Sequence, residues 1–518
     1  MKLFLRYFAV VAVMAIFALP WPASAGEVAS SPYSGLDGVE LLDVAMPHRH
    51  SRDIAQSSVG IGFETLDRRT FDPKWTFPLI GECGVKWARC QTGWIRCEKE
   101  KGKYDFFWLD EVVDSLAAQG VETWFSLSFG NPLWTPCEKF DKALQEGRDC
   151  GEIVPGWARG YVGENPICHG PEAMAAWLKY VRAIARHFKG RVRVWELWNE
   201  PEWFFRYKNE PVCLLYGNKK AVELFESFMR QTAAALRAEI PDARISYNSA
   251  VLSCDWLPYL AQLKVTDYID IYNLHGYEQI PEAALSASVA QARALLKKPD
   301  GSPIEIWQGE SGRATGPAAN GPSLPSQFSQ ARFIARRIAA DWSEGLGLSS
   351  IFTVTDFLKY YPDGRNQYYG VLDGETREPK KGYWTLQTMA WLGDGLRRAP
   401  EHWLYFKTVK WHELVGMTPY AAVRTASFER KGRVVYAFWQ QEHVELDAKP
   451  LRGTLRFVTG RGGMPFAHPI LIDPVRRQIW DLSKRGIVDK DKRGIYEIVG
   501  IYALDYPLFL TDKAALAE

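Results

Sequence analysis

The chain has 518 residues, of which 47% are hydrophobic and 24% are charged, and its formal net charge at pH 7 is +2. This near-neutral balance, with no long run of one charge, argues against nucleic acid or an anionic membrane as the main partner. By length the chain is expected to form roughly two or three domains.

The first 25 residues have the features of a secretory signal peptide. Lys2 and Arg6 precede an apolar run that ends in a small-residue cleavage motif, Ala-Ser-Ala. A membrane anchor is the alternative reading, but Pro20 and Pro22 interrupt a run that is short for a spanning helix. We therefore expect export to the periplasm or the cell exterior, without stable insertion into the membrane.

From residue 57 to 393, short β-type runs alternate with amphipathic helical stretches. The predicted strands are 57–65, 85–94, 121–130, 191–200, 243–251, 268–277, 303–311 and 348–357. The predicted helices are 108–120, 171–190, 219–239, 256–264, 281–297, 326–345 and 379–393. Eight strands with helical or looped crossovers predict a closed α/β (β/α)8 TIM barrel. An open doubly wound sheet fits less well, because no G-x-G-x-x-G motif follows the first strand.

Beyond residue 395 the chain has short β runs without long helices. Two of them, within 421–440, meet at Lys431-Gly432. This pattern predicts an antiparallel β-sandwich that supports the barrel. The predicted divisions are a signal peptide (1–25), a barrel (26–395) with an irregular insertion near 131–170, and a β-sandwich (396–518).

Eight cysteines in a chain with an export signal predict disulfide bonds. They are Cys83, Cys90, Cys97, Cys137, Cys150, Cys168, Cys213 and Cys254. Their spacing lacks the paired C-x-x-C motifs of zinc sites, so no metal is expected. Three of them fall near the insertion, where we expect at least one local disulfide. The pairing is not given by the sequence.

Two predicted strands end in a glutamate, Glu200 on the fourth and Glu310 on the seventh. In such barrels the active residues lie at the C-terminal ends of the strands, so both side chains would face one mouth. Two carboxyl groups in one cleft are the equipment of glycoside hydrolysis. Apolar neighbours raise the pKa of the acid, and hydrogen-bond donors keep the nucleophile ionised.

The segment VWELWNEPEWFF places three tryptophans around the Asn-Glu-Pro motif. Strand alternation would turn Trp195 toward the helices, and would turn Trp198 and Glu196 toward the barrel interior. A buried Glu196 needs a partner, and Arg89 on the second strand is the candidate.

Three more side chains are open to two interpretations, and a fourth, Trp307, has one. Trp203 and Trp134 lie past the ends of their strands and could be sugar-stacking platforms or core residues. Trp307 has the opposite strand parity to Glu310 and is expected in the core. Asp356, which ends the eighth strand, could bind a sugar or cap a turn.

Here the residues resemble a known group of enzymes. WELWNEPE resembles the fourth-strand signature of the clan A glycoside hydrolases, and IWQGES is similar to their seventh-strand motif. The C-terminal ILIDPVRRQIW and YPLFLTD are similar to the sandwich attached to family 39 enzymes. This family includes β-xylosidases, α-L-iduronidases and exopolysaccharide hydrolases.

The resemblance implies an enzyme that hydrolyses O-glycosyl bonds of an oligosaccharide or polysaccharide with net retention. Glu200 would be its general acid/base and Glu310 its nucleophile. The resemblance implies no cofactor.

Four further residues take roles from the resemblance. Asn199 would bind the sugar 2-hydroxyl, and His275 would line the sugar site. Tyr277 would hold the nucleophile by a hydrogen bond, and Arg89 would help to keep it ionised.

The sequence leaves other functions open. A catalytically silent carbohydrate-binding protein could use the same fold, although the presence of both glutamates disfavours it. A transglycosidase would use the same carboxylates, and a product assay with an added acceptor sugar distinguishes it from a hydrolase. If the insertion covers the mouth, the site is a pocket for chain ends, and otherwise it is a cleft that cuts within chains. We expect the closed form.

Overall fold

We describe the protein from a computed structural model. The described residues are 30–136, 165–207, 210–211, 219–249, 256–316, 326–361, 364–408, 423–444, 448–460, 462–490 and 494–517. The predicted signal peptide and most of the predicted insertion lie outside them.

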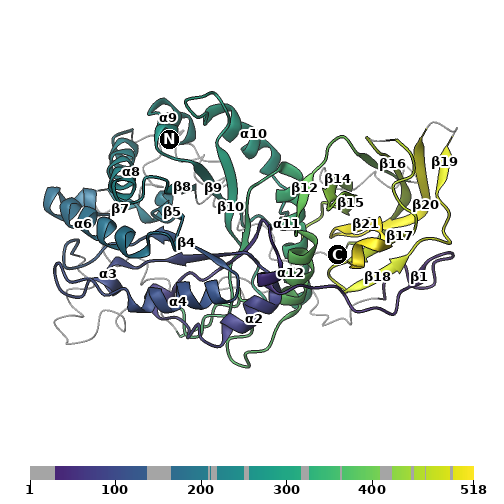
Figure 1. The fold of residues 1–518 in the computed structure, drawn as a ribbon, viewed down its shortest axis with the longest axis horizontal. Coiled ribbons are helices and arrows are strands. Elements are labelled where there is room, and N and C mark those ends of the chain that lie inside the picture. The colour runs from purple at the N-terminus through teal and green to yellow at the C-terminus, as the bar shows by residue number, and fades with distance from the viewer. Residues whose placement is uncertain are drawn as a thin grey trace, which may run out of the picture.

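Eight parallel strands close into a barrel in the order β10-β11-β2-β3-β4-β5-β8-β9 (Figure 1). These strands are β2 (Val59–Gly62), β3 (Trp87–Gln91), β4 (Glu122–Leu127), β5 (Val194–Leu197), β8 (Arg244–Ser249), β9 (Ile271–His275), β10 (Glu305–Ser311) and β11 (Ser349–Ile351). The predicted TIM barrel is confirmed, and each strand is shorter than the predicted range that contains it.

Helices surround the barrel in Figure 1. They are α2 (Thr76–Cys83), α4 (Phe107–Ala118), α6 (Pro171–Phe188), α8 (Lys219–Glu239), α9 (Leu257–Gln262), α10 (Leu285–Leu295), α11 (Gln327–Glu344) and α12 (Lys381–Leu392). All but α2 were predicted. Its eight residues include Pro78 and Gly81, which have low helix propensity. The four-residue α3 (Trp94–Cys97) was also missed.

The barrel interior near the N-terminal ends of the strands is filled by large apolar side chains. Trp124 of β4 and Trp307 of β10 lie four strands apart around the ring, yet their ring centroids are 5.5 Å apart. They can meet only across the interior. Trp307 is therefore a core residue, as predicted, but it points to the same side as Glu310. A register shift between Gln308 and Glu310 breaks the strand alternation.

The C-terminal part forms two antiparallel sheets, which confirms the predicted sandwich. One sheet has the order β1-β18-β17-β21-β15-β14-β12 and contains β1 (Glu40–Leu41), β12 (Leu396–Arg398), β14 (Val423–Arg430), β15 (Arg433–Gln440), β17 (Pro469–Asp473), β18 (Gln478–Asp481) and β21 (Leu508–Asp512). The other sheet has the order β13-β16-β20-β19 and contains β13 (Trp403–Thr408), β16 (Leu451–Val458), β19 (Val488–Lys490) and β20 (Ile495–Ala503). β14 and β15 form the predicted hairpin at Lys431-Gly432.

The N-terminal segment belongs to the sandwich rather than to the barrel. β1 pairs with β18, and Tyr33 donates a hydrogen bond to the carbonyl of Tyr502. Figure 1 shows β1 beside the yellow C-terminal strands. The predicted division assigned residues 26–395 to the barrel, whereas β1 pairs with the sandwich sheet. Two residues of β1 carry too little sequence pattern to reveal a distant partner.

Three cysteines do not form the disulfides predicted from composition. Cys83, Cys90 and Cys97 are buried free thiols, and burial raises the pKa of each. The Cys97 thiol, for example, lies 3.3 Å from the carbonyl oxygen of Thr92. Each thiol sits in the packed core, where it behaves as a small apolar side chain.

Four other cysteines, Cys137, Cys150, Cys213 and Cys254, lie outside the described residues. A disulfide in the insertion therefore stays a prediction. Among the helices of the described ranges, none combines the length and the apolar character needed to cross a bilayer.

Candidate active site

A cavity of about 380 Å³ opens at the C-terminal ends of the barrel strands. It is lined by Glu64, Thr65, Arg68, Gln91, Phe129, Asn199, Glu200, Tyr277, Glu310, Phe352, Tyr360, Tyr361, Gln367 and Tyr369. This volume and this mixture of aromatic and convergent polar groups are those of a small-molecule site. The two predicted carboxyl groups, Glu200 and Glu310, both line it.

A tight turn after β5 positions Glu200. The strand ends at Leu197, and Trp198 and Glu200 both have left-handed backbone angles, with φ of 69° and 41°. Asn248 of β8 spans the turn. Its amide nitrogen donates to the Trp198 carbonyl at 2.8 Å, and its oxygen accepts from the Glu200 N–H at 2.6 Å. Asn248 was not predicted, because no motif distinguishes it.

The same turn corrects the prediction for Trp198. Its ring lies 6.1 Å from that of Trp177 on α6 and 5.6 Å from that of Phe228 on α8. Trp198 thus packs toward the helices instead of toward the barrel interior, because strand alternation stops where β5 ends.

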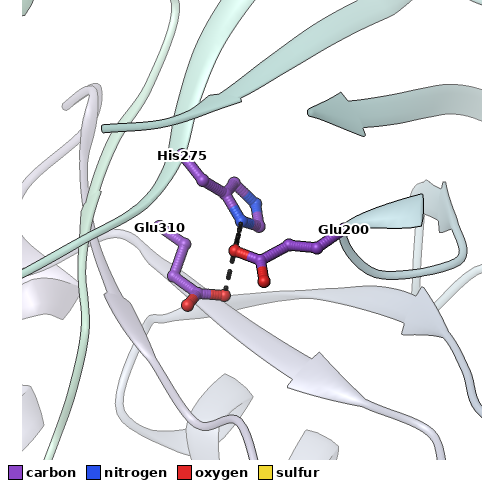
Figure 2. Close-up of side chains that lie close together, drawn as sticks. All are labelled: Glu200, His275 and Glu310. Carbon is purple, nitrogen blue, oxygen red and sulfur yellow. Dashed lines mark hydrogen bonds and ion pairs between the residues drawn. The ribbon is translucent and has the colours of Figure 1, made fainter. Parts of the chain in front are cut away.

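His275 joins the two candidate catalytic carboxyl groups. Its Nδ1 lies 2.9 Å from Glu200 Oε1 and 3.7 Å from Glu310 Oε2. An oxygen of Glu200 and an oxygen of Glu310 lie within 4.8 Å of each other. Figure 2 shows the two carboxyl groups directed toward one another beside the imidazole. His275 is only 1% exposed and lies behind the carboxyl groups. It was predicted to line the sugar site, but it is not among the residues that line the cavity.

The two groups that meet here have shifted pKa values. Burial raises the pKa of Glu200 to about 8, and the nearby Glu202 and Glu196 add to this rise against the lowering effect of Arg89. Burial lowers the pKa of His275 to about 4, although Glu310 acts in the opposite direction. At neutral pH, Glu200 is therefore mostly protonated and His275 is neutral.

Glu310 is held by two donors. The Tyr277 hydroxyl donates to Oε1 at 2.7 Å, and Arg89 Nη1 donates to Oε2. Both bonds stabilise the ionised carboxylate. These are the contacts that the sequence resemblance implied for the two residues.

Arg89 is the centre of a buried polar network. Its side chain is 0% exposed, and it forms the predicted ion pair with Glu196, which is confirmed. Its Nη2 also donates to Asn199 Oδ1 at 2.7 Å. Because Arg89 takes the oxygen, the amide nitrogen of Asn199 is the group that can donate to a bound sugar. Asn273 of β9 completes the shell with a hydrogen bond of 2.5 Å to Glu196.

Glu64 is a third carboxyl group in the cavity and was not predicted. It follows β2, is 1% exposed, and its Oε1 accepts from Arg89 Nη1 at 3.3 Å. Gly62 gives it room, since a Cβ there would lie 1.8 Å from Glu64 Oε2. Burial raises the pKa of Glu64 to about 8 against the effect of Arg89, and Glu310 raises it further. The one available signal was an acidic residue near the end of the predicted strand 57–65.

Trp134 lies outside the cavity. The Trp134 indole donates to Glu98 at 3.1 Å and lies under the Lys101 ammonium, 4.0 Å from the ring centroid. Trp203 belongs to the short helix α7 (Pro201–Phe204), and its side chain lies outside the described residues.

Asp356 has a structural role. Its carboxylate pairs with Lys380 at 2.6 Å and accepts from the N–H of Gly370 at 2.9 Å. These bonds fasten the segment after β11 to the start of α12, which is the capping alternative of the two predictions.

The cavity wall contains aromatic residues that the sequence did not single out. Phe129 follows β4, whereas Phe352, Tyr360, Tyr361 and Tyr369 follow β11. Such faces suit the apolar sides of sugar rings. They carry no motif, because their positions depend on how two loops fold over the mouth.

The cluster of Glu200, His275 and Glu310 is compact enough for one atom of each to reach a metal ion. However, Arg89 and Tyr277 already donate to the two oxygens of Glu310. The Arg89 charge beside it would also repel a second cation. The donor set therefore fits a protonation site better than a metal site.

Comparison with known proteins supports the interpretation of the cavity as an active site. The family model described as beta-galactosidase, glycoside hydrolase family 42, matches residues 68–214. This range includes Arg89, Asn199 and Glu200. Beta-galactosidase BgaA of Clostridium cellulovorans is 29% identical over 131 residues, which are 24% of this chain and 18% of the relative. The match therefore spans less than a fifth of that enzyme.

Solved structures extend the similarity to the whole fold. A family 39 glycoside hydrolase from Bacteroides cellulosilyticus aligns with a TM-score of 0.61 at 15% identity, over 90% of this chain and 82% of that one. The family 39 enzyme of Xanthomonas axonopodis pv. citri aligns with a TM-score of 0.51 at 16% identity, over 90% and 95%. The chain has the barrel-and-sandwich fold of family 39. The predicted likeness to clan A glycoside hydrolases is confirmed.

Proposed function

We propose that the protein is an exported glycoside hydrolase that cleaves O-glycosidic bonds by double displacement, with net retention. The observation that carries this proposal is the pairing of Glu200, whose pKa is raised, with Glu310, whose oxygens accept from Arg89 and Tyr277. The two carboxyl groups share one cavity. In a retaining enzyme one of them acts as an acid and must be protonated, and the other acts as a nucleophile and must be ionised.

In the first step, a carboxylate oxygen of Glu310 forms a bond to the anomeric carbon while the glycosidic bond breaks. Glu200 transfers its proton to the departing oxygen and becomes a carboxylate. The neutral His275, 2.9 Å away, can then donate its Nδ1 hydrogen to this new charge. In the second step, Glu200 takes a proton from water, the oxygen of that water attacks the anomeric carbon, and the ester bond to Glu310 breaks.

The separation of the carboxyl groups supports retention. Retaining enzymes have their carboxyl groups about 5–5.5 Å apart, whereas inverting enzymes need about 6.5–9.5 Å to admit a water. One oxygen of Glu200 lies within 4.8 Å of one oxygen of Glu310, which is shorter than the separation that an inverting enzyme needs.

The sequence relatives guide the choice of substrate. The curated relative is named a beta-galactosidase. The family model, also described as beta-galactosidase, matches the part of the chain that holds Arg89, Asn199 and Glu200. We propose an aryl β-galactoside as the first substrate of a panel, followed by aryl xylosides and other glycosides. Export, with cleavage after Ala25, belongs to the same proposal, and the mass of the mature protein tests it.

The deciding experiment compares wild type with Glu200→Ala on aryl glycosides, with and without azide. An aryl leaving group needs little acid assistance, so the variant should still form the glycosyl-enzyme. Azide should then restore turnover and give a glycosyl azide of the substrate's configuration. Glu202→Ala is a matched control two residues away, because the buried Glu202 bonds to Ser249 at 2.8 Å, and it should show no rescue.

An unaffected Glu200→Ala variant, or an azide product of inverted configuration, would refute the proposed roles. A wild type that binds sugars but cleaves neither aryl glycosides nor polymers would support the carbohydrate-binding alternative. Transfer to an added acceptor sugar, in preference to water, would identify a transglycosidase.

A further inference from the structure

The loop after β9, residues 276–284, begins with Gly276 and Tyr277, and Tyr277 is the residue that holds Glu310. We propose that the C-terminal sandwich is a positioning element of the candidate active site, in which Trp439 of β15 fixes this loop through Glu282. The proposal rests on the proposed function and adds a role for the second domain, beyond support of the barrel.

The barrel fixes the start of the loop. With the Gln308 amide oriented to satisfy both neighbours, its nitrogen donates to the Leu274 carbonyl at 2.6 Å and its oxygen accepts from the Gly276 N–H at 2.9 Å. These bonds set the direction in which the chain leaves β9, but they end one residue before Tyr277.

The sandwich fixes the far side of the loop through Glu282, which is 5% exposed. The Trp439 indole donates to its Oε1 at 2.7 Å. Arg336 of α11 donates from Nε to Oε1 at 3.0 Å and from Nη2 to Oε2 at 2.6 Å. Although burial acts to raise it, Arg336 and Trp439 hold the pKa of Glu282 below its usual value. The carboxylate is thus clamped between a barrel helix and a sandwich strand.

The backbone beyond β15 runs along the same loop. The Val444 N–H donates to the Gln279 carbonyl at 3.1 Å, and Arg336 Nη1 donates to the Glu442 carbonyl. The sandwich therefore contacts the loop at two residues, Gln279 and Glu282, both within five residues after Tyr277.

This arrangement makes the hydrogen bond between Tyr277 and Glu310 depend on the sandwich. If the far side of the loop shifts, Tyr277 can follow it, because the anchor from Gln308 lies before this residue. Displacement of a positioned group by about 1 Å can cost about 100-fold in rate. Trp439 acts through Glu282 and Tyr277 and contacts no reacting atom, so it is a positioning residue.

The same interface supplies a matched control. Arg332 of α11 pairs with Asp505 of the sandwich, and both side chains are buried, at 5% and 8% exposed. Like the hydrogen bond from Arg336 to Glu442, this pair joins α11 to the sandwich. Among the hydrogen bonds and ion pairs of the described residues, none connects Arg332 or Asp505 to the loop 276–284. Its loss should affect only stability.

The test compares Trp439→Phe, which removes the indole donor and keeps an aromatic ring, with Asp505→Asn in the full chain. The substrate is the aryl glycoside that wild type cleaves fastest. We expect Trp439→Phe to lower kcat by about 10-fold or more with little change in KM. Inactivation by the matching 2-deoxy-2-fluoro glycoside should slow in parallel. Asp505→Asn should lower Tm and leave these kinetic values unchanged.

The outcomes separate this inference from the proposed function. If wild type neither turns over nor is trapped by the fluoro glycoside, the proposed function fails first. If wild type is active and Trp439→Phe changes only Tm, as Asp505→Asn does, the inference is overturned. Should Trp439→Phe fail to fold, Glu282→Gln, which keeps the size of the side chain, replaces it. An unchanged kcat in that variant would also overturn the inference.

Discussion

Arg89 and Glu196 form an ion pair inside the barrel in which both side chains are 0% exposed. The pair joins β3 to β5, and Arg89 also reaches Glu310 on β10. Water does not stabilise either charge, so each depends on the other and on the surrounding donors. The Arg89 guanidinium therefore connects Glu310 to the ion pair in the barrel interior.

Removal of Arg89 should be more damaging than removal of the whole pair. We expect Arg89→Met to lower the free energy of unfolding by about 3–5 kcal/mol, because Glu196 is left as an uncompensated buried charge. Arg89→Met combined with Glu196→Gln should recover part of this loss. Urea unfolding of the two proteins checks the prediction, and an equal or larger loss in the double variant would contradict it.

The raised pKa of Glu200 predicts the alkaline limit of activity. In the proposed mechanism the first step needs protonated Glu200, and burial raises the pKa of Glu200 to about 8. The rate should therefore be maintained below about pH 8 and fall tenfold per unit above it. The measurement is kcat/KM from pH 5 to 10 with two aryl glycosides of different leaving-group acidity. The alkaline decline should weaken with the better leaving group, and a decline independent of the leaving group would argue against Glu200 as the acid.

Glu64 should make stability depend on pH. Its folded-state pKa of about 8 lies above the ordinary value of 4.5, so the folded state binds more protons than the unfolded state between these values. Stability contributed by protonated Glu64 is present below about pH 4.5 and is lost as pH rises toward 8. Glu64→Gln removes this loss, so its Tm relative to wild type should increase from pH 5 to pH 8. The exposed Glu100→Gln is the control, and a Tm difference for Glu64→Gln that does not change with pH would refute the shift.

The sequence predicted those parts of the site that depend on strand order and charge compensation. Eight alternating units placed Glu200 and Glu310 at one mouth, and the need of Glu196 for a buried cation led to Arg89. These predictions rely on rules that hold wherever a parallel barrel closes.

Predictions failed where the chain leaves regular geometry. Trp198 turns toward the helices because the backbone becomes left-handed after Leu197. Trp307 and Glu310 share a side because the register shifts between Gln308 and Glu310. The position of Glu64 depends on the space above Gly62, which only the folded barrel defines. The alternation of side chains along a strand and the spacing of residues in the sequence contain none of this information.

Tyr277 offers the most direct test of how Glu310 is held. Its hydroxyl donates to Oε1 at 2.7 Å, and a hydrogen bond to a charged group contributes about 1.5–3 kcal/mol. We expect Tyr277→Phe to lower kcat by roughly 10- to 100-fold, because the anionic nucleophile loses one of its two donors. Tyr180→Phe is the matched control, since its buried hydroxyl bonds Thr92 at 2.9 Å, away from the cavity. The control should lose stability but keep its kcat. If both variants keep kcat, the hydroxyl of Tyr277 does not support the proposed role of Glu310, and Arg89 is the donor that holds this carboxyl group.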